Sequence, residues 1–526
     1  MKVCLITSAA YIDTELAAEF GRLPPSFLPI GHQRLYELQV ANLVKSLGCQ
    51  TYLTLPKSFV ISKSDQEWLD RQSVGTIFVP DGLSLGQSIL FSLECIQHQF
   101  DEVSILHGDT LIEDIPIYKG DLVAMSEAPE SYEWGFLSPN RNDQFSEGSE
   151  SNSLVMAGYF SFQDVALLKK ALSQEALTFP ECIAFYDGVR SLDRHLIYSW
   201  LDFGHLQTFY RSRCQVSTQR VFNELSINFS SVIKTSNHSQ KIRNEANWFD
   251  SIPLHLRLFT PALLGMNMQS PASYSLEYLP YPTLHELFVF GHLKGSNWDS
   301  ILVSCFDFME QCANFPYADN PVDLPLTYLL SEKSAIRLKT FLQSTNIGLD
   351  ANWSYEDKAL PSIGEMLDIT KNKINLKATQ YLGVMHGDLC FTNIFYNFRT
   401  HRIQVIDPRG SFNDSHQSIY GDIRYDMAKL AHSIIGGYDY ILANRFKCTG
   451  FNERNLSIIF PDDANIKLVK DISKNYKICG MSLDDEQIMA IMFHLFISML
   501  PLHNDRPERQ QAFLANALRL FSLEFA

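Results

Sequence analysis

The N-terminal part of the chain alternates between strand-like and helix-like patterns. Runs rich in apolar and β-branched residues predict four buried strands: KVCLIT (2–7), QTYLTL (50–55), GTIFVP (75–80) and VSILHGD (103–109). Between them, the segments 35–48 and 86–100 place apolar residues at helical spacing. This alternation is typical of a parallel sheet with helices on both faces.

The pattern changes after about residue 215. SSVIK (230–234) and SYSLEYL (273–279) predict strands on either side of a charged helix, KIRNEANWFDSI (241–252). From about residue 295 the chain is mostly helical, with one β-rich island at 382–407. The apolar stretch 488–500 is interrupted by His494 and is too short to cross a bilayer, so we expect a buried helix and no membrane span.

The length of 526 residues exceeds one ordinary domain of roughly 150 residues. We expect one domain over 1–214 and a second over 215–526. The second divides into an N-lobe of about 215–290 and a C-lobe of about 291–526. The polar segment 141–153 has no apolar period and predicts a loop or flap.

The composition narrows the classes of partner. The net charge is -16, from 43 Lys+Arg against 59 Asp+Glu, and no basic run is present, so we expect no nucleic-acid partner. An acidic protein that handles phosphates needs metal ions at the site. The ten cysteines form no Cys-x-x-Cys pair and the start MKVCLITSAA is not a secretion signal, which predicts a cytoplasmic protein with free thiols. A homo-oligomer is left open.

The densest chemical motif is VMHGDLCFTNIFYNFRTHRIQVIDPRG (384–410). Its Asp388 is followed five residues later by Asn393, and Asp407 ends an apolar strand. Phosphoryl transfer needs a carboxylate to orient and deprotonate the attacking hydroxyl, and oxygen ligands for Mg²⁺. Asp388 suits the first role, and Asn393 and Asp407 suit the second. His386 is expected to brace the loop through backbone hydrogen bonds.

Upstream, Lys234 ends an apolar strand and Glu245 lies in the charged helix that follows. A lysine held by a glutamate can contact nucleotide phosphates without losing its charge. The segment 273–287 is then the expected hinge strand, whose backbone would pair with an adenine ring. The structural alternatives are turn-forming roles for Asp388 and Asp407, and an exposed ion pair for Lys234 and Glu245.

These residues of about 215–526 resemble the aminoglycoside phosphotransferase and choline kinase family, which is related to protein kinases. The resemblance implies a bilobal protein-kinase-like (α+β) domain that uses ATP and Mg²⁺, and it gives Asp426 of GDIRYDMAKL (421–430) the role of supporting the catalytic loop. Two departures stand out: the phosphate-covering segment 215–228 has no glycine, and Pro-Arg-Gly follows Asp407. Since protein-kinase activation-loop features are missing, we expect a small-molecule acceptor.

The first domain contains a second series of weaker motifs. They are FGRLPPSFLPIGHQRLYELQ (20–39), DGLSLGQSIL (81–90), VSILHGDTLI (103–112), LVMAGYFSF (154–162) and WLDFGHLQTFYRSR (200–213). In this order they resemble the sugar-phosphate nucleotidyltransferases and cytidylyltransferases. The resemblance implies a Rossmann-like α/β domain, metal-binding roles for Asp109 and Asp202, and nucleotide contacts from Arg22 and Gly86.

This domain departs from that family at its phosphate loop. The stretch TSAAYIDTELAAEFGR (7–22) contains a single glycine, Gly21, and Ser26 stands where the family has a lysine. Either Arg22 and Arg34 replace the lost cation, or the domain binds nucleotide poorly. The structural alternative is that Asp109 merely ends a strand.

Two functional hypotheses follow. In the first, a bifunctional enzyme phosphorylates a hydroxyl of a sugar, polyol or amino alcohol with ATP, then couples the product to a nucleotide from CTP or UTP, for surface or capsular polysaccharide synthesis. In the second, the kinase carries a degenerate nucleotidyltransferase-like domain used for binding or as a scaffold. An antibiotic-modifying or protein kinase ranks last, because neither explains the N-terminal domain.

Overall fold

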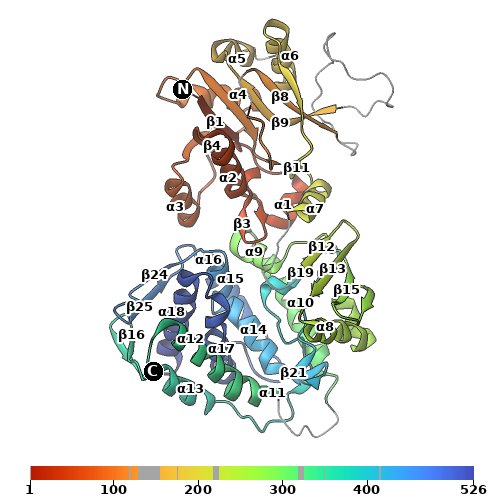
Figure 1. The fold of residues 1–526 in the computed structure, drawn as a ribbon, viewed down its shortest axis with the longest axis vertical. Coiled ribbons are helices and arrows are strands. Elements are labelled where there is room, and N and C mark those ends of the chain that lie inside the picture. The colour runs from red at the N-terminus through yellow and green to blue at the C-terminus, as the bar shows by residue number, and fades with distance from the viewer. Residues whose placement is uncertain are drawn as a thin grey trace. The chain divides into compact units, whose positions relative to one another are not determined.

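The computed structural model describes residues 2–117, 120–127, 154–174, 176–216, 224–317, 325–348, 350–413 and 416–526. The chain divides into two compact units, Met1–Arg213 and Cys214–Ala526, called here the first and the second unit (Figure 1). The segment 141–153, expected to be a loop, lies outside the described residues. So do residues 217–223 of the expected phosphate-covering segment.

A seven-stranded sheet in the order β10-β8-β9-β6-β1-β4-β5 forms the centre of the first unit. Its strands are β1 (Lys2–Thr7), β4 (Gln50–Pro56), β5 (Gly75–Val79), β6 (Glu102–His107), β8 (Leu122–Glu127), β9 (Leu154–Phe162) and β10 (Asp193–Leu196). β1 pairs in parallel with β4 and β6, and β4 with β5, as the alternation predicts. β9 departs from this pattern, because it runs antiparallel to both of its neighbours, β6 and β8.

Helices pack on this sheet because the strands are apolar on both faces. The helices of the first unit are α1 (Thr14–Phe20), α2 (Leu35–Leu47), α3 (Lys63–Arg71), α4 (Leu85–Cys95), α5 (Val165–Leu172), α6 (Phe179–Val189) and α7 (Leu206–Gln215). Val3 and Leu5 of β1 share one buried cluster with Ile89 of α4 and Leu168 of α5. α4 begins at the capping pair Ser84 and Gln87 and ends at Cys95, earlier than predicted, because the polar residues after Ile96 break the apolar period.

The second unit begins with an antiparallel sheet in the order β12-β13-β15-β14. These strands are β12 (Glu224–Ile227), β13 (Ser231–Ser236), β14 (Leu263–Asn267) and β15 (Ala272–Glu277). The charged helix α8 (Ser239–Ser251) packs on β15, and its buried face carries Ile242, Ala246 and Phe249. The strand, helix and strand expected here are therefore confirmed.

Helices make up most of the remainder. They are α9 (Leu284–Phe290), α10 (Gly295–Ala313), α11 (Pro325–Thr327), α12 (Ser334–Thr345), α13 (Ile363–Lys371), α14 (Ile423–Ile434), α15 (Tyr438–Leu442), α16 (Ala464–Ser473), α17 (Glu486–Met499) and α18 (Pro507–Glu524). α17 is central, because it packs against α14, α18, α12 and α13 (Figure 1). The predicted buried helix is thus confirmed. By length and composition alone, Glu486–His503 could cross a membrane, but 67% of it is buried inside the unit.

The expectation of one β-rich island in this part was wrong. The island itself is present, as β18 (Leu382–Val384), β19 (Ile394–Asn397) and β20 (Arg402–Val405). A separate sheet contains β16 (Trp353–Tyr355), β17 (Lys358–Leu360), β24 (Lys447–Thr449) and β25 (Asn455–Ile459). Three of these strands have three residues, which is too short for a period of two to be visible in the sequence, whereas the five residues of β25 were missed.

The topology confirms the predicted fold class. The first unit is an α/β domain with a mainly parallel, Rossmann-like sheet. The second is an α+β domain with a small antiparallel sheet followed by a helical lobe, the bilobal arrangement expected of a kinase-like domain. These two folds determine which sequence-distant residues can meet.

Candidate active sites

The loop that follows β18 carries the densest motif and is held by its backbone. Asp426, in the first turn of α14, accepts hydrogen bonds from the N–H groups of His386 and Gly387, both at 2.7 Å. Gly387 has φ 81°, and a Cβ there would lie 2.6 Å from Cβ of Arg409. Only glycine fits this position. The expected role of Asp426 as the support of the loop is therefore confirmed.

His386 is fully buried and braces the same loop from within. Its Nδ1 accepts a hydrogen bond from the N–H of Asp388 at 3.3 Å, and its ring lies edge-on to Trp248, with the ring centroids 5.6 Å apart. Burial lowers the pKa of His386 to about 4. The ring is consequently neutral near pH 7 and can accept this bond.

Asp388 presents a half-exposed carboxylate whose two oxygens are both engaged. Oδ1 lies 2.8 Å from Nζ of Lys429 in α14, and Oδ2 accepts a hydrogen bond from Nδ2 of Asn393 at 3.1 Å. Burial alone would raise the pKa of Asp388, but the charge of Lys429 and its hydrogen bond outweigh burial and hold this pKa well below its usual range. The carboxylate is therefore ionised and oriented.

The hairpin of β19 and β20 brings the two expected magnesium ligands to one end. Asn393 directly precedes β19, Asp407 follows β20, and the N–H of Ile406 donates to the carbonyl of Asn393 at 3.0 Å. Asp407 has φ 59°, a left-handed conformation that is strained for a residue other than glycine. Such strain is common where a side chain is held for function.

Lys234 and Glu245 form the expected pair. Nζ of Lys234 lies 2.7 Å from Oε2 of Glu245 and 3.0 Å from Oδ1 of Asp407, and Tyr274 donates to the same Glu245 oxygen at 2.8 Å. Lys234 is 4% exposed. Burial alone would lower the pKa of Lys234, but Asp407 and Glu245 more than offset it and raise this pKa, so the ammonium stays charged. The alternative of an exposed ion pair is excluded.

The second-unit site thus consists of Lys234, Glu245, His386, Asp388, Asn393 and Asp407, which β13, α8 and the β18–β20 region bring together. The side-chain amide oxygen of Asn393 and the carboxylate of Asp407 are hard ligands that suit Mg²⁺. No group of three or more His, Cys, Asp or Glu side chains arranged for a metal occurs among the described residues. These two ligands would fit a magnesium ion whose other ligands are water and phosphate oxygens.

In the first unit, Asp109 directly precedes one strand of a pair, and Asp202 ends the other. β7 (Thr110–Ile112) and β11 (Trp200–Asp202) are antiparallel, with Asp202 opposite Thr110. A Cβ on Gly204 would lie 2.8 Å from Oδ2 of Asp109 and 3.4 Å from Oδ1 of Asp202, so the glycine leaves space beside both carboxylates. Burial, and next the charge of Asp202, raise the pKa of Asp109 to about 6. Two crowded carboxylates beside an open space fit a divalent cation.

The expected phosphate-binding cations divide into one exposed and one buried arginine. Arg22 is exposed and its guanidinium stacks 3.8 Å from the ring centroid of Tyr11. The expectation for Arg34 was wrong, because this residue is buried, lies 3.2 Å from Asp65 and donates to the carbonyl of Phe27 at 2.7 Å. Asp65 lies on α3, too far along the chain for the sequence to indicate this pair.

The two remaining positions of the first-unit motifs serve the packing of the fold. Ser26, which stands in place of the expected lysine, is buried and donates to the carbonyl of Gly108 at 3.0 Å. Gly86 lies in the first turn of α4, where a Cβ would make an ordinary contact with Leu172 of α5 at 3.6 Å, so its expected nucleotide contact stays a prediction. The residues that the structure brings together in the first unit are Asp109, Asp202 and Gly204.

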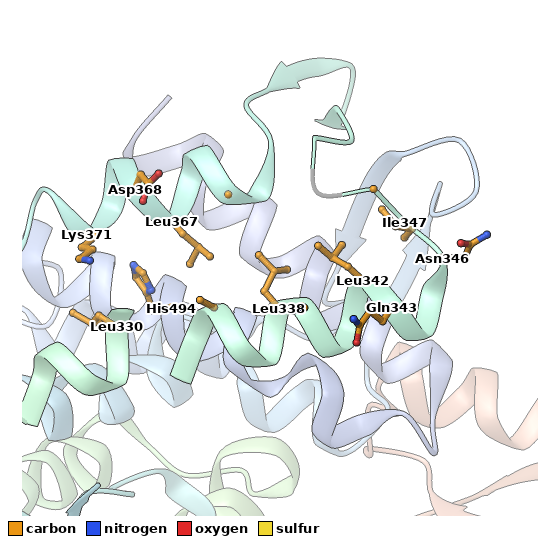
Figure 2. A pocket seen from close by; sticks show the side chains of 14 residues that line it. Leu330, Leu338, Leu342, Gln343, Asn346, Ile347, Leu367, Asp368, Lys371 and His494 are labelled. Atoms are coloured by element: carbon orange, nitrogen blue, oxygen red, sulfur yellow. The ribbon is translucent and has the colours of Figure 1, made fainter. Parts of the chain in front are cut away.

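A pocket of about 750 Å³ lies elsewhere in the second unit, between α12 and α13 (Figure 2). Leu338 and Leu342 of α12 face Leu367 of α13 across it, and His494 of α17 lies near one end beside Lys371. Neither Asp388 nor any other residue of the second-unit site lines it. The pocket is thus separate from the candidate chemistry.

Lys429 is the functional residue that sequence reasoning missed. It lies three residues after Asp426 on α14, so both side chains point from one face of the helix toward the loop. The spacing of the two residues was visible in GDIRYDMAKL, but the direction of that face was not.

No protein-family model and no curated protein matches this sequence. Among solved structures, a UTP-bound UGPase from Acinetobacter baumannii is similar at 14% identity and a TM-score of 0.30, over 41% of this chain and 92% of that one. The inositol-1-phosphate CTP transferase from T. maritima is similar at 13% identity and a TM-score of 0.30, over 39% of this chain and 90% of that one. An aminoglycoside-3'-phosphotransferase of type VIII is similar at 12% identity and a TM-score of 0.34, over 54% of this chain and 92% of that one. The similar structures thus include nucleotidyltransferases and an aminoglycoside phosphotransferase.

Proposed function

We propose that the second unit is an ATP-dependent kinase of a small hydroxyl-bearing acceptor. The observation that carries this proposal is that Lys234, Asp388, Asn393 and Asp407, from three separate segments, meet in one site with the residue types that phosphoryl transfer needs. The acceptor oxygen gains the γ-phosphoryl group, ADP leaves, and the hydroxyl proton passes to Asp388.

Each residue has a separate task in this step. Asp388 orients the acceptor hydroxyl and takes its proton, because its carboxylate is ionised and partly exposed. Lys234 directs a fixed positive charge toward the nucleotide phosphates. Magnesium held by Asn393 and Asp407 would neutralise charge on those phosphates.

We further propose that the first unit transfers a nucleotidyl group to the phosphorylated product. The acceptor phosphate attacks the α-phosphorus of CTP or UTP, pyrophosphate leaves, and an activated sugar or polyol of the kind used for surface polysaccharides results. The carboxylates of Asp109 and Asp202, with the space at Gly204, support a cation site for this chemistry. A scaffold role is the second candidate, favoured by the burial of Arg34 against Asp65 and by Ser26 in the place of a lysine.

One set of assays separates these proposals. Purified full-length protein is incubated with Mg²⁺, ATP, CTP or UTP and candidate acceptors, and both ADP and pyrophosphate are measured. Asp109→Ala should abolish pyrophosphate release and leave ADP release intact. Asp388→Ala should abolish ADP release, yet leave pyrophosphate release intact when phosphorylated acceptor is supplied.

Two results would reject parts of the scheme. Absence of pyrophosphate with every nucleotide would reject nucleotidyl transfer and leave the scaffold role. Absence of any ADP release that depends on Asp388 would reject the kinase.

A further inference from the structure

The half-exposed carboxylate of Asp388 is backed by a buried ammonium. Lys429 is 7% exposed, and its Nζ lies 2.8 Å from Oδ1 of Asp388. A lysine is rarely buried to this degree unless it is paired. The contact therefore restrains both side chains. Of the two, Asp388 is the member that is exposed to solvent.

The loop itself supplies no cation. The segment HGDLCFTN (386–393) contains no lysine or arginine, so positive charge near Asp388 must come from other segments. Arg409 contributes from the segment after Asp407, but its Nη2 donates to Oη of Tyr425 at 2.6 Å and its guanidinium lies 4.6 Å from that ring's centroid. Lys429 is the cation in direct contact with the Asp388 carboxylate.

α14 holds this loop at two points. Asp426 fixes the backbone of His386 and Gly387, and Lys429 fixes the side chain of Asp388. With Asn393 on Oδ2, both carboxylate oxygens have one partner each, which leaves further lone pairs for an acceptor hydroxyl. Since a misplacement of about 1 Å can cost about 100-fold in rate, this clamp bears directly on turnover.

We propose that Lys429 is a positioning residue that holds the carboxylate of Asp388 for acceptor activation. This inference rests on the proposed kinase function. Because Lys429 is buried behind the carboxylate and Asp388 is the exposed member of the pair, the lysine acts through Asp388 and not on the acceptor itself.

Variants of Lys429 test the positioning role in the full-length protein, with ADP release from Mg²⁺ and ATP as the assay. Lys429→Met should lower kcat about 10- to 100-fold and leave KM for ATP within about twofold, because the lost contact is to Asp388 and not to the nucleotide. In an Asp388→Asn background the same change should have little further effect, since the pair is already broken. Exogenous ethylamine should restore part of the activity of Lys429→Ala.

The outcomes are distinguishable from a failure of the kinase proposal. If the wild type releases no ADP that depends on Asp388, the kinase proposal fails. If the wild type is active and Lys429→Met matches its kcat, the positioning role is overturned. Should Lys429→Ala fail to fold by circular dichroism, the Lys429→Met rate and the double variant still decide.

Discussion

The two candidate sites differ in the partners of their carboxylates. In the second unit, Asp388 has Lys429 and Asp407 has Lys234, each at 3.0 Å or less. In the first unit, Asp202 ends β11 and Asp109 directly precedes the paired strand β7, and among the described residues no lysine or arginine forms an ion pair with either. Asp202 has His205 as its partner, with Nδ1 3.5 Å from Oδ2. The second-unit site thus pairs its carboxylates with buried lysines, whereas the first-unit carboxylates crowd each other beside one partly exposed histidine, and a bound cation would relieve that repulsion.

The largest expected effect tests the compensated site. Asp388→Asn keeps the shape of the side chain and removes the base, so kcat for ADP release should fall about 100-fold or more. The Kd of ATP, measured by calorimetry, should stay within about twofold. Asp471→Asn is the matched control, because Asp471 is exposed and pairs with the exposed Lys474 at 2.7 Å. Turnover near that of the wild type would remove Asp388 from the mechanism.

A smaller effect is expected at the lysine that links β13 to the site. Lys234→Met removes a buried charge that contacts Glu245 and Asp407, and kcat/KM for ATP should fall about 10- to 100-fold. Lys241→Met is the control, since Lys241 is 61% exposed and lies 3.7 Å from the other Glu245 oxygen. Exposed pairs contribute little, so its kcat/KM should change less than about twofold. Equal losses in both variants would argue against a role for Lys234 at the phosphates.

Stability should reveal the crowding of Asp109 by Asp202 in the first unit. The folded-state pKa of Asp109 is about 6, against an ordinary value of 3.8, so the folded chain binds more protons and its stability falls as pH rises between these values. Asp109→Asn removes this loss. In EDTA at pH 8, its Tm should exceed that of the wild type by about 2–4 °C for each kcal/mol gained.

Two controls accompany this measurement. The difference in Tm should shrink at pH 4, where the wild-type carboxyl is largely protonated. Added Mg²⁺ should raise Tm of the wild type more than that of the variant. An Asp109→Asn variant that melts below the wild type at pH 8 would contradict the account of two crowded carboxylates.

The smallest effect is expected at Arg22. This exposed guanidinium stacks on Tyr11, and exposed charges contribute at most about 1 kcal/mol. Arg22→Gln should therefore weaken CTP or UTP binding by about fivefold or less, measured by calorimetry on the full chain. Arg71→Gln, on the last turn of α3, is the control. A loss of 100-fold would show that Arg22 carries the phosphate site.

The two sites also differ in how far the sequence could predict them. The spacing of Asp388, Asn393 and Asp407 reflects one loop and one hairpin, so local pattern was sufficient to identify residues that the fold brings together. Lys429 and Arg34 depend on packing between distant segments, α14 against the loop and Arg34 against Asp65. A single sequence contains no signal for such pairs. Arg34 was a candidate for binding phosphate, whereas the fold buries its side chain.

The fold class could be predicted from the hydrophobic periodicity, but the short strands could not. The apolar runs of β1 and β6 are long enough to be recognised as strands in the sequence, whereas β16 and β17 have only three residues each. The direction of β9 was not predicted either, because its run LVMAGYFSF is apolar on both faces whichever way it lies. Strand direction depends on neighbours, which a local pattern cannot include.

Gly204 has a consequence for how the first unit could change over generations. A single base change converts a glycine codon to alanine, and the added methyl would enter the space beside Asp109 and Asp202. That substitution would obstruct the proposed cation site without altering either acidic residue. A domain of this kind could therefore lose metal binding through one substitution and keep only a structural role. This chain has glycine at position 204, so the space beside the two carboxylates is preserved.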